Sequence, residues 1–271
     1  MLQRVHHDRG LVTLQSPRLA AIGVVHGFST RVGGVSPPPF DSLNLGSLAK
    51  SVEPGDDSDP NANVAENFRR FRAAIGAAKR VRVAVRQVHG SGVWSPPSGA
   101  VKPGDEPEAD AIVTGDPLQM AVVRTADCAP VLLATPDGKR VAAAHAGWRG
   151  LVAGVLGRAV ETLAERSGAE PRELVAAVGP AIGVEAYEVG PEVAKAFHDA
   201  ELMPVVRLDF GDKPHVDLRA AVVLRLAAAG LDPDRIDTTD HCTHRDADWF
   251  YSYRRDGRRS GRLAAAIAPR P

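Results

Sequence analysis

Cysteine is scarce in this chain, and a net charge of either sign is absent. Only Cys128 and Cys242 are cysteines among 271 residues, which argues against a disulfide-stapled scaffold and favours a reducing, cytoplasmic location. Thirty-three basic side chains balance 33 acidic ones. Because basic and acidic side chains balance, we do not expect a broad surface of one charge. We therefore expect no nucleic-acid or membrane partner and favour a small-molecule substrate.

Long apolar runs are missing as well. No stretch approaches the roughly 18 apolar residues that indicate a membrane span, and the charged segment Met1–Gly10 is not followed by the apolar region of a secretory signal. The hydrophobic fraction of 44% is enough to bury a core without disulfides or metal. A metal in this chain is therefore expected to serve chemistry rather than stability.

The hydrophobic pattern predicts a mixture of strands and helices in a single domain, residues 1–271, with roughly the first 15 residues loosely ordered. Strands are expected at residues 22–28, 81–86, 111–114, 120–125, 131–135, 141–145, 174–178 and 262–267. Several of these are dense in Val, Ala and Leu, which is typical of strands buried on both faces. Helices are expected at residues 64–74, 150–166, 191–200 and 218–229. The Gly-, Pro- and Ser-rich segment 29–46 is expected to be a loop that lines a site.

Three short motifs combine metal-binding side chains with glycine or proline. They are Gln87-Val88-His89-Gly90, Thr125-Ala126-Asp127-Cys128-Ala129-Pro130 and His145-Ala146-Gly147-Trp148-Arg149-Gly150. Two imidazoles and one thiolate are donors that Zn²⁺ favours, and three protein ligands leave one position open for water or substrate. The ligands are 39 and 17 residues apart (89 to 128, 128 to 145), unlike the close pairs of a zinc finger. A sheet must therefore bring them together, as in a catalytic site.

These motifs belong to a wider match, because the sequence resembles the YfiH family, also called the laccase-domain, multicopper polyphenol oxidase-like or purine nucleoside phosphorylase family. The matching segments cover most of the chain and are Ser29–Ser36, Ser42–Gly46, Gln87–Gly90, Thr125–Pro130, His145–Gly150, Gly179–Gly183, Tyr187–Gly190 and Phe250–Asp256. The resemblance implies an α+β fold of two mixed β-sheets packed face to face and flanked by helices. This four-layer arrangement is similar to the catalytic domain of the cytotoxic necrotizing factors.

The resemblance also implies a function. In the family the matching residues, here His89, Cys128 and His145, bind a catalytic zinc. The implied reactions are phosphorolysis of purine nucleosides (adenosine, inosine, guanosine or methylthioadenosine) and deamination of adenosine, so the expected partners are a purine nucleoside and phosphate. The sequence does not indicate the oligomeric state.

Arginines near the motifs are candidates for phosphate or substrate binding, because a planar guanidinium suits a phosphate. Arg31 in the Gly-rich loop and Arg149 after His145 are the best placed, and Arg254 is a further candidate. A surface ion pair is the alternative for each. The family usually has Asn-Arg early in the first long helix, where this chain has Asn67-Phe68. Arg69 is an uncertain substitute, because one residue turns a helical side chain by about 100°.

Two further polar residues have two interpretations each. Asp127 either acts as a general base or plays a structural role, and strand alternation, which would point Asp127 and Cys128 to opposite faces, favours the structural role. Asn44 either contacts substrate or caps the loop. The segment His241-Cys242-Thr243-His244 has metal-type side chains, but adjacent residues of an extended strand point apart, so we do not predict a metal there.

Other functions remain open. A cysteine hydrolase with Cys128 as nucleophile and His145 as base is the first alternative, and a related one is editing of peptidoglycan precursors, a role attributed to some relatives. A copper-dependent polyphenol oxidase ranks third, because copper centres usually use more His or a Met, and the chain has three Met. A non-enzymatic binding module ranks last.

Overall fold

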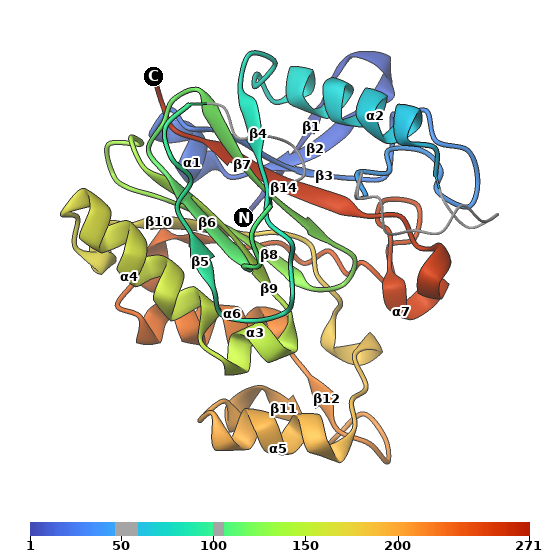
Figure 1. Cartoon of the computed structure of the whole chain (residues 1–271). Helices are drawn as coiled ribbons and strands as arrows, with labels where there is room; N and C mark the ends of the chain where they lie inside the picture. The colour runs from blue at the N-terminus through green and yellow to red at the C-terminus, as the bar shows by residue number, and fades with distance from the viewer. Residues whose placement is uncertain (47–58, 100–105) are drawn as a thin grey trace.

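Two six-stranded mixed sheets pack against each other in the computed structural model, which describes residues 1–46, 59–99 and 106–271 (Figure 1). The first sheet has, in spatial order, β1 (Gln3–His6), β2 (Val12–Gln15), β3 (Val25–Ser29), β14 (Leu263–Ala268), β7 (Gln119–Thr125) and β4 (Val81–Val83). The second has β13 (Ile236–Asp237), β10 (Val175–Val178), β8 (Ala129–Ala134), β9 (Val141–Ala146), β6 (Ala111–Thr114) and β5 (Val93–Trp94). A separate ribbon pairs β11 (Val206–Arg207) with β12 (His215–Val216).

Helices cover the outer face of each sheet (Figure 1). The first sheet is covered by α2 (Asn61–Ala74), and the second packs against α3 (Trp148–Val152), α4 (Val155–Ser167) and α6 (Leu218–Ala228). Helix α5 (Pro191–Asp199) contacts α3 and lies beside the β11–β12 ribbon (Figure 1). Two short helices, α1 (Pro17–Ala21) and α7 (Tyr253–Asp256), lie in connections. Within the described ranges, no helix combines the length and the apolar character needed to cross a membrane.

Alternation along the central strands produces the layers. In β8, Leu132 belongs to the core between the sheets, whereas Leu133 belongs to the core beneath α4 and α6. In β14, Ala265 lies between the sheets and Ala266 packs under α2. Because both faces are covered, every residue of these strands is buried. The expected α+β fold of two mixed sheets flanked by helices is confirmed.

The structure differs from the sequence expectations at several places, and the strand expected over 81–86 is shorter, because β4 covers Val81–Val83 alone. The helix expected over 150–166 is two helices, because Gly154 has the left-handed φ of 83° and separates α3 from α4. The expectation of a loosely ordered start is wrong for β1 and β2, which form an antiparallel pair running from Gln3 opposite Gln15 to His6 opposite Val12. Polar side chains on this edge strand hid it from the apolar pattern.

The loop 30–46 is irregular, as predicted, and is anchored to α2 by the buried side chain of Asn67. Its amide nitrogen donates to Ser36 Oγ and to the carbonyl oxygens of Ser42 and Asn44, at 2.8, 3.2 and 3.0 Å. Its Oδ1 accepts the N–H of Val35 at 2.9 Å. The side chain of Asn67 thus supplies hydrogen-bond partners to backbone groups of the loop that are not paired in a sheet.

We expect Asn67→Ala to lower the free energy of unfolding by about 2–4 kcal/mol, because it leaves several buried loop groups without partners. Asn61→Ala is the matched control, since Asn61 is exposed on the first turn of the same helix, and its effect should stay within about 0.5 kcal/mol. Urea unfolding measures both. Equal effects of the two substitutions would show that Asn67 does not anchor the loop.

Candidate metal centre and its pocket

Three side chains with metal-binding atoms meet where the chain passes from one sheet to the other. His89 follows β4, Cys128 lies in the turn from β7 in the first sheet to β8 in the second, and His145 lies in β9. Pairing of β8 with β9 places Pro130 opposite His145, which brings Cys128 beside that histidine. The ligand atoms of the three residues all lie within 4.8 Å of one another.

The donor set suits zinc. Bonds of about 2.0–2.1 Å to nitrogen and about 2.3 Å to sulfur place neighbouring donors of a tetrahedral zinc about 3.3–3.6 Å apart. Cys128 Sγ lies 3.9 Å from His89 Nε2, and the rings of His89 and His145 meet edge to face with centroids 4.8 Å apart. If the three donor atoms moved slightly closer together, their spacing would therefore match that of a tetrahedral zinc site.

A buried carboxylate, Asp110, organises two of the three donors. It accepts Nδ1–H of His145 at 2.8 Å and the backbone N–H groups of Val88, His89 and Gly90 at 3.2, 3.0 and 2.7 Å. Its own carbonyl oxygen accepts the backbone N–H of His145 at 2.7 Å. Because an ionised carboxylate only accepts, the proton of His145 is on Nδ1 and Nε2 is left as the ligand nitrogen.

Two residues of the site have a left-handed backbone, His89 with φ 58° and Asp127 with φ 89°. Asp127 therefore lies in a turn rather than in a strand, and the alternation argument does not apply to it. Its carboxylate accepts the hydroxyl of Thr243 and the backbone N–H of Arg254, both at 2.6 Å. Because both oxygens are engaged, this arrangement favours the structural interpretation of Asp127, which fixes the carboxy-terminal segment against the site.

Gly147 leaves the room that the donors need. A Cβ atom at this position would lie 2.9 Å from Cδ2 of His89 and 3.0 Å from Sγ of Cys128. Both distances are shorter than ordinary van der Waals contact. The glycine in the third motif is therefore a steric requirement of the donor cluster.

The electrostatics of the group stabilise a thiolate. Burial raises the pKa of the Cys128 thiol, but the imidazoles of His145 and His89 outweigh it and lower the pKa to about 6. Burial lowers the pKa of His145, but Cys128 and Asp110 outweigh it and raise the pKa to about 9. Without a bound metal, the pair is therefore a thiolate and an imidazolium at neutral pH, and a metal ion held by these residues would displace the Nε2 proton of His145.

The three donors open into a pocket of about 680 Å³, a volume typical of small-molecule sites. Cationic and aromatic side chains complete its lining, namely Arg124, Arg149, Arg254, Arg262, Trp148, Tyr187 and Tyr253. Asp127 is the one acidic side chain among the described residues that line it. The pocket therefore suits an anion together with a planar ring.

Arg149 and Arg254, two of the predicted substrate residues, lie on the wall of this pocket. The guanidinium of Arg149 lies 4.4 Å from the ring centroid of Trp148. That of Arg254 lies 5.3 Å from the ring of Tyr187 and donates to the carbonyl oxygen of Glu188 at 2.9 Å. Both arginines thus stack on aromatic rings at the edge of the cavity.

Arg31 and Asn44, by contrast, do not line the pocket. Arg31 donates to the carbonyl oxygens of Asp41 and Ala247 at 2.8 and 3.1 Å and forms an ion pair with the Asp41 carboxylate at 3.2 Å. Asn44 is buried, and its Oδ1 accepts the backbone N–H of Arg262 at 2.9 Å. Both residues have structural partners that hold the loop 30–46 in place.

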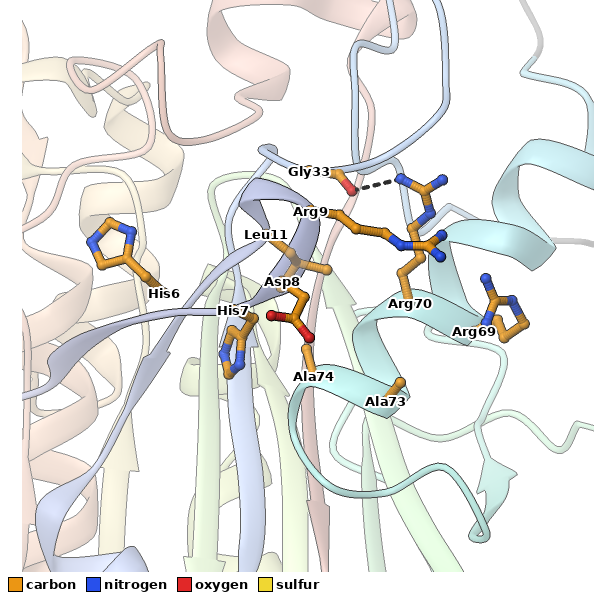
Figure 2. A pocket seen from close by; sticks show the side chains of 10 residues that line it. All are labelled: His6, His7, Asp8, Arg9, Leu11, Gly33, Arg69, Arg70, Ala73 and Ala74. Atoms are coloured by element: carbon orange, nitrogen blue, oxygen red, sulfur yellow. Dashed lines mark hydrogen bonds between the residues drawn. The ribbon is translucent and has the colours of Figure 1, made fainter.

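Arg69 lies in a different pocket, of about 510 Å³, between the turn after β1 and helix α2 (Figure 2). Its guanidinium pairs with Glu66 at 2.6 Å. The neighbouring Phe68 is buried in the core beneath α2, and the guanidinium of Arg82 lies 5.0 Å from its ring. The helical rotation between positions 68 and 69 thus turns Arg69 away from the donors.

Sequence reasoning missed Asp110, Arg124, Tyr187 and Arg262. A signal for Asp110 was present, because an acid directly before the fully buried strand β6 needs several donors. The other three lie on segments far apart in the chain, and only their placement in the fold reveals their common pocket.

The carboxy-terminal segment 241–244 forms no metal cluster. Cys242 is buried, and its Sγ accepts the N–H of Gly183 at 3.1 Å, while His241 bonds to Asp246 at 2.9 Å. Across residues 1–46, 59–99 and 106–271, the group of His89, Cys128 and His145 is the one set of three or more such side chains close enough to share an ion.

Comparisons with known proteins place this fold and site in a family. The family model described as "Multi-copper polyphenol oxidoreductase laccase" matches residues 25–270. The chain is 42% identical over 247 residues to "Purine nucleoside phosphorylase YfiH" of Escherichia coli K12, covering 90% of this chain and 93% of that protein. It is also 42% identical over 258 residues to "Purine nucleoside phosphorylase" of Deinococcus radiodurans, covering 95% and 93%.

Solved structures agree with these matches. YlmD from Geobacillus stearothermophilus superimposes with a TM-score of 0.83 at 28% identity, covering 99% of each chain. The Neisseria meningitidis protein NMB0706 superimposes with a TM-score of 0.77 at 32% identity, covering 100% of this chain and 99% of that one. The chain therefore belongs to the YfiH family of laccase-like proteins.

Proposed function

We propose that this chain is a zinc-dependent purine nucleoside phosphorylase that also deaminates adenosine. The observation that carries the proposal is the convergence of His89, Cys128 and His145 at a pocket lined by arginines and aromatic rings. The names of the relatives, purine nucleoside phosphorylases in Escherichia coli and Deinococcus radiodurans, support the same substrate class.

In phosphorolysis, an oxygen of phosphate forms a bond to C1′ of the ribose while the bond between C1′ and the purine nitrogen breaks. The electron pair of the broken bond goes to the purine, which takes up a proton, and ribose 1-phosphate is released. In deamination, water replaces the amino group at C6 of adenosine, and ammonia leaves. When bound, zinc supplies a Lewis acid for both reactions.

The residues of the chain supply binding and orientation. Trp148 and Tyr187 offer ring faces on which a purine stacks. Burial, followed by the nearby Cys128, raises the pKa of Tyr187, so its hydroxyl stays protonated and donates a hydrogen bond to the base. Arg149 and Arg254, which line the same pocket, are placed to contact the substrate.

Turnover tests the proposal directly. Zinc-loaded protein incubated with adenosine and phosphate should release adenine and ribose 1-phosphate, together with inosine from the second reaction, as followed by chromatography. Cys128→Ser should lose bound zinc and both activities, because one donor of three is weakened. Cys242→Ser, at the other cysteine, should keep both. Absence of all products from fully zinc-loaded protein would refute the assignment.

Alkylation of Cys128 separates a metal ligand from a cysteine nucleophile. Without metal, the rate of reaction with iodoacetamide should rise with a midpoint near pH 6, because the pKa of the thiol is lowered to about 6. Zinc should suppress the reaction at pH 7.5, and Cys242→Ala removes any signal from the second thiol. Undiminished alkylation in the presence of zinc would instead favour the cysteine hydrolase.

Asp110→Asn should weaken zinc binding by roughly 10- to 100-fold, because the neutral amide keeps only one acceptor oxygen and places an NH₂ group where the second oxygen accepts N–H groups. Competition with a chelating dye measures the change. Asp116→Asn is the matched control, since Asp116 caps a turn by accepting the N–H groups of Gly99 and Leu118 and does not line the pocket. If the two variants bind zinc equally well, Asp110 does not position the ligands.

A further inference from the structure

A second pair of arginines, Arg124 and Arg262, lies on the wall of the same pocket. Arg124 is near the end of β7, and Arg262 directly precedes β14. These strands are antiparallel neighbours, with Ala264 opposite Arg124 and Leu263 opposite Thr125. The register therefore brings Arg124 and Arg262 to the same end of these two strands, where both line the pocket of the metal centre.

Arg124 is held by its backbone, whereas its guanidinium has no partner among the residues that the structure describes. The side chain of Gln87 donates to the carbonyl oxygen of Arg124 and accepts its N–H, both at 2.8 Å. In the described parts of the chain, no hydrogen bond or ion pair of the Arg124 guanidinium is found. Glu106 is the acidic side chain that acts on the pKa of Arg124. It already forms an ion pair with Arg82 at 3.4 Å.

Over the described residues, the guanidinium of Arg262 has hydrogen-bond partners on one of its three nitrogens. Its Nη1 donates to the carbonyl oxygens of Ser260 and Gly261 at 2.7 and 3.1 Å, and its guanidinium lies 5.6 Å from the ring centroid of Tyr253. These contacts use one nitrogen and fix the plane of the group. Within residues 1–46, 59–99 and 106–271, its Nε and Nη2 donors have no partner, so they are available to a ligand.

The electrostatics agree with this placement. Burial lowers the pKa of Arg124; Glu106 opposes the shift, and the like charges of Arg82 and Arg262 add to it. Burial also lowers the pKa of Arg262, against the opposing influence of Tyr253, Asp127 and Cys128. Two partly buried cations side by side are unfavourable unless an anion compensates them.

The two arginine pairs of the pocket differ in what they already contact. Arg149 and Arg254 stack on Trp148 and Tyr187, and Arg254 also donates to a backbone carbonyl. Arg124 has no such partner in the described ranges. A phosphate dianion needs several charge-assisted donors close together, and the register of β7 and β14 gives Arg124 and Arg262 that proximity.

We propose that Arg124 and Arg262 bind the phosphate co-substrate, so that phosphate lies on the β7–β14 side of the pocket and the purine on the Trp148–Tyr187 side. This inference rests on the proposed function for the identity of the second substrate. The binding site itself stands on the arrangement of the two guanidinium groups. Arg124 is thereby a substrate-binding residue that the family motifs do not include.

Calorimetric titration of the zinc-loaded protein with inorganic phosphate, with and without adenine, tests the site apart from turnover. Arg124→Met should weaken phosphate binding roughly 10- to 100-fold, the loss expected for charge-assisted hydrogen bonds. Arg124→Lys, which keeps the charge but not the planar fork, should weaken it less. Arg86→Met is the control, because Arg86 pairs with Glu108 and is 67% exposed outside the pocket.

The kinetic counterpart is a rise in the KM for phosphate by the same factor, with the KM for adenosine changed less than about twofold. Zinc content and thermal melting confirm that each variant is folded and loaded. Unchanged phosphate binding in Arg124→Met, or no binding to the wild-type protein, would overturn the inference. Arg124-dependent phosphate binding without nucleoside turnover would retain this anion site and refute the proposed function instead.

Discussion

The carboxylate of Asp110 is the interaction on which the site depends. It accepts four hydrogen bonds, three from the backbone around His89 and one from the ring of His145. Burial raises the pKa of Asp110, but the donors, His145 first, outweigh it and lower the pKa, so the group stays ionised. A single buried charge thus fixes the left-handed backbone turn that carries His89 and the orientation of the His145 imidazole at once.

The layered fold gives this arrangement its location. Cys128 lies where the chain leaves one sheet and enters the other, and the alanine-rich strands β9 and β14 keep the two sheets close. The aromatic wall comes from the segments that carry Trp148 and Tyr187, and the second arginine pair comes from β7 and β14. The fold therefore brings arginines and aromatic rings together around one group of donors.

The sequence predicted the donors, the architecture and two arginines of the pocket wall, Arg149 and Arg254, but not the other surroundings of the site. His89, Cys128 and His145 were found because glycine and proline flank them at strand ends, and the central strands because apolar runs are a strong signal. Arg31 and Arg69 were expected near the substrate on the strength of their charge, yet the structure gives each a carboxylate partner elsewhere. Arg124 and Arg262 were missed because the sequence does not show that they line the same pocket. Strand register, which single-sequence patterns do not specify, decides which charged side chains share a cavity.

Zinc K-edge X-ray absorption of protein purified without chelators tests the central claim most directly. A zinc bound by Cys128, His89 and His145 predicts one sulfur at about 2.3 Å, two imidazole nitrogens at about 2.0–2.1 Å and one further light atom in the first coordination shell. No zinc site with this sulfur should be found in Cys128→Ser, which is expected to lose the bound metal. A spectrum without sulfur, or one with four protein ligands and no open position, would contradict the account.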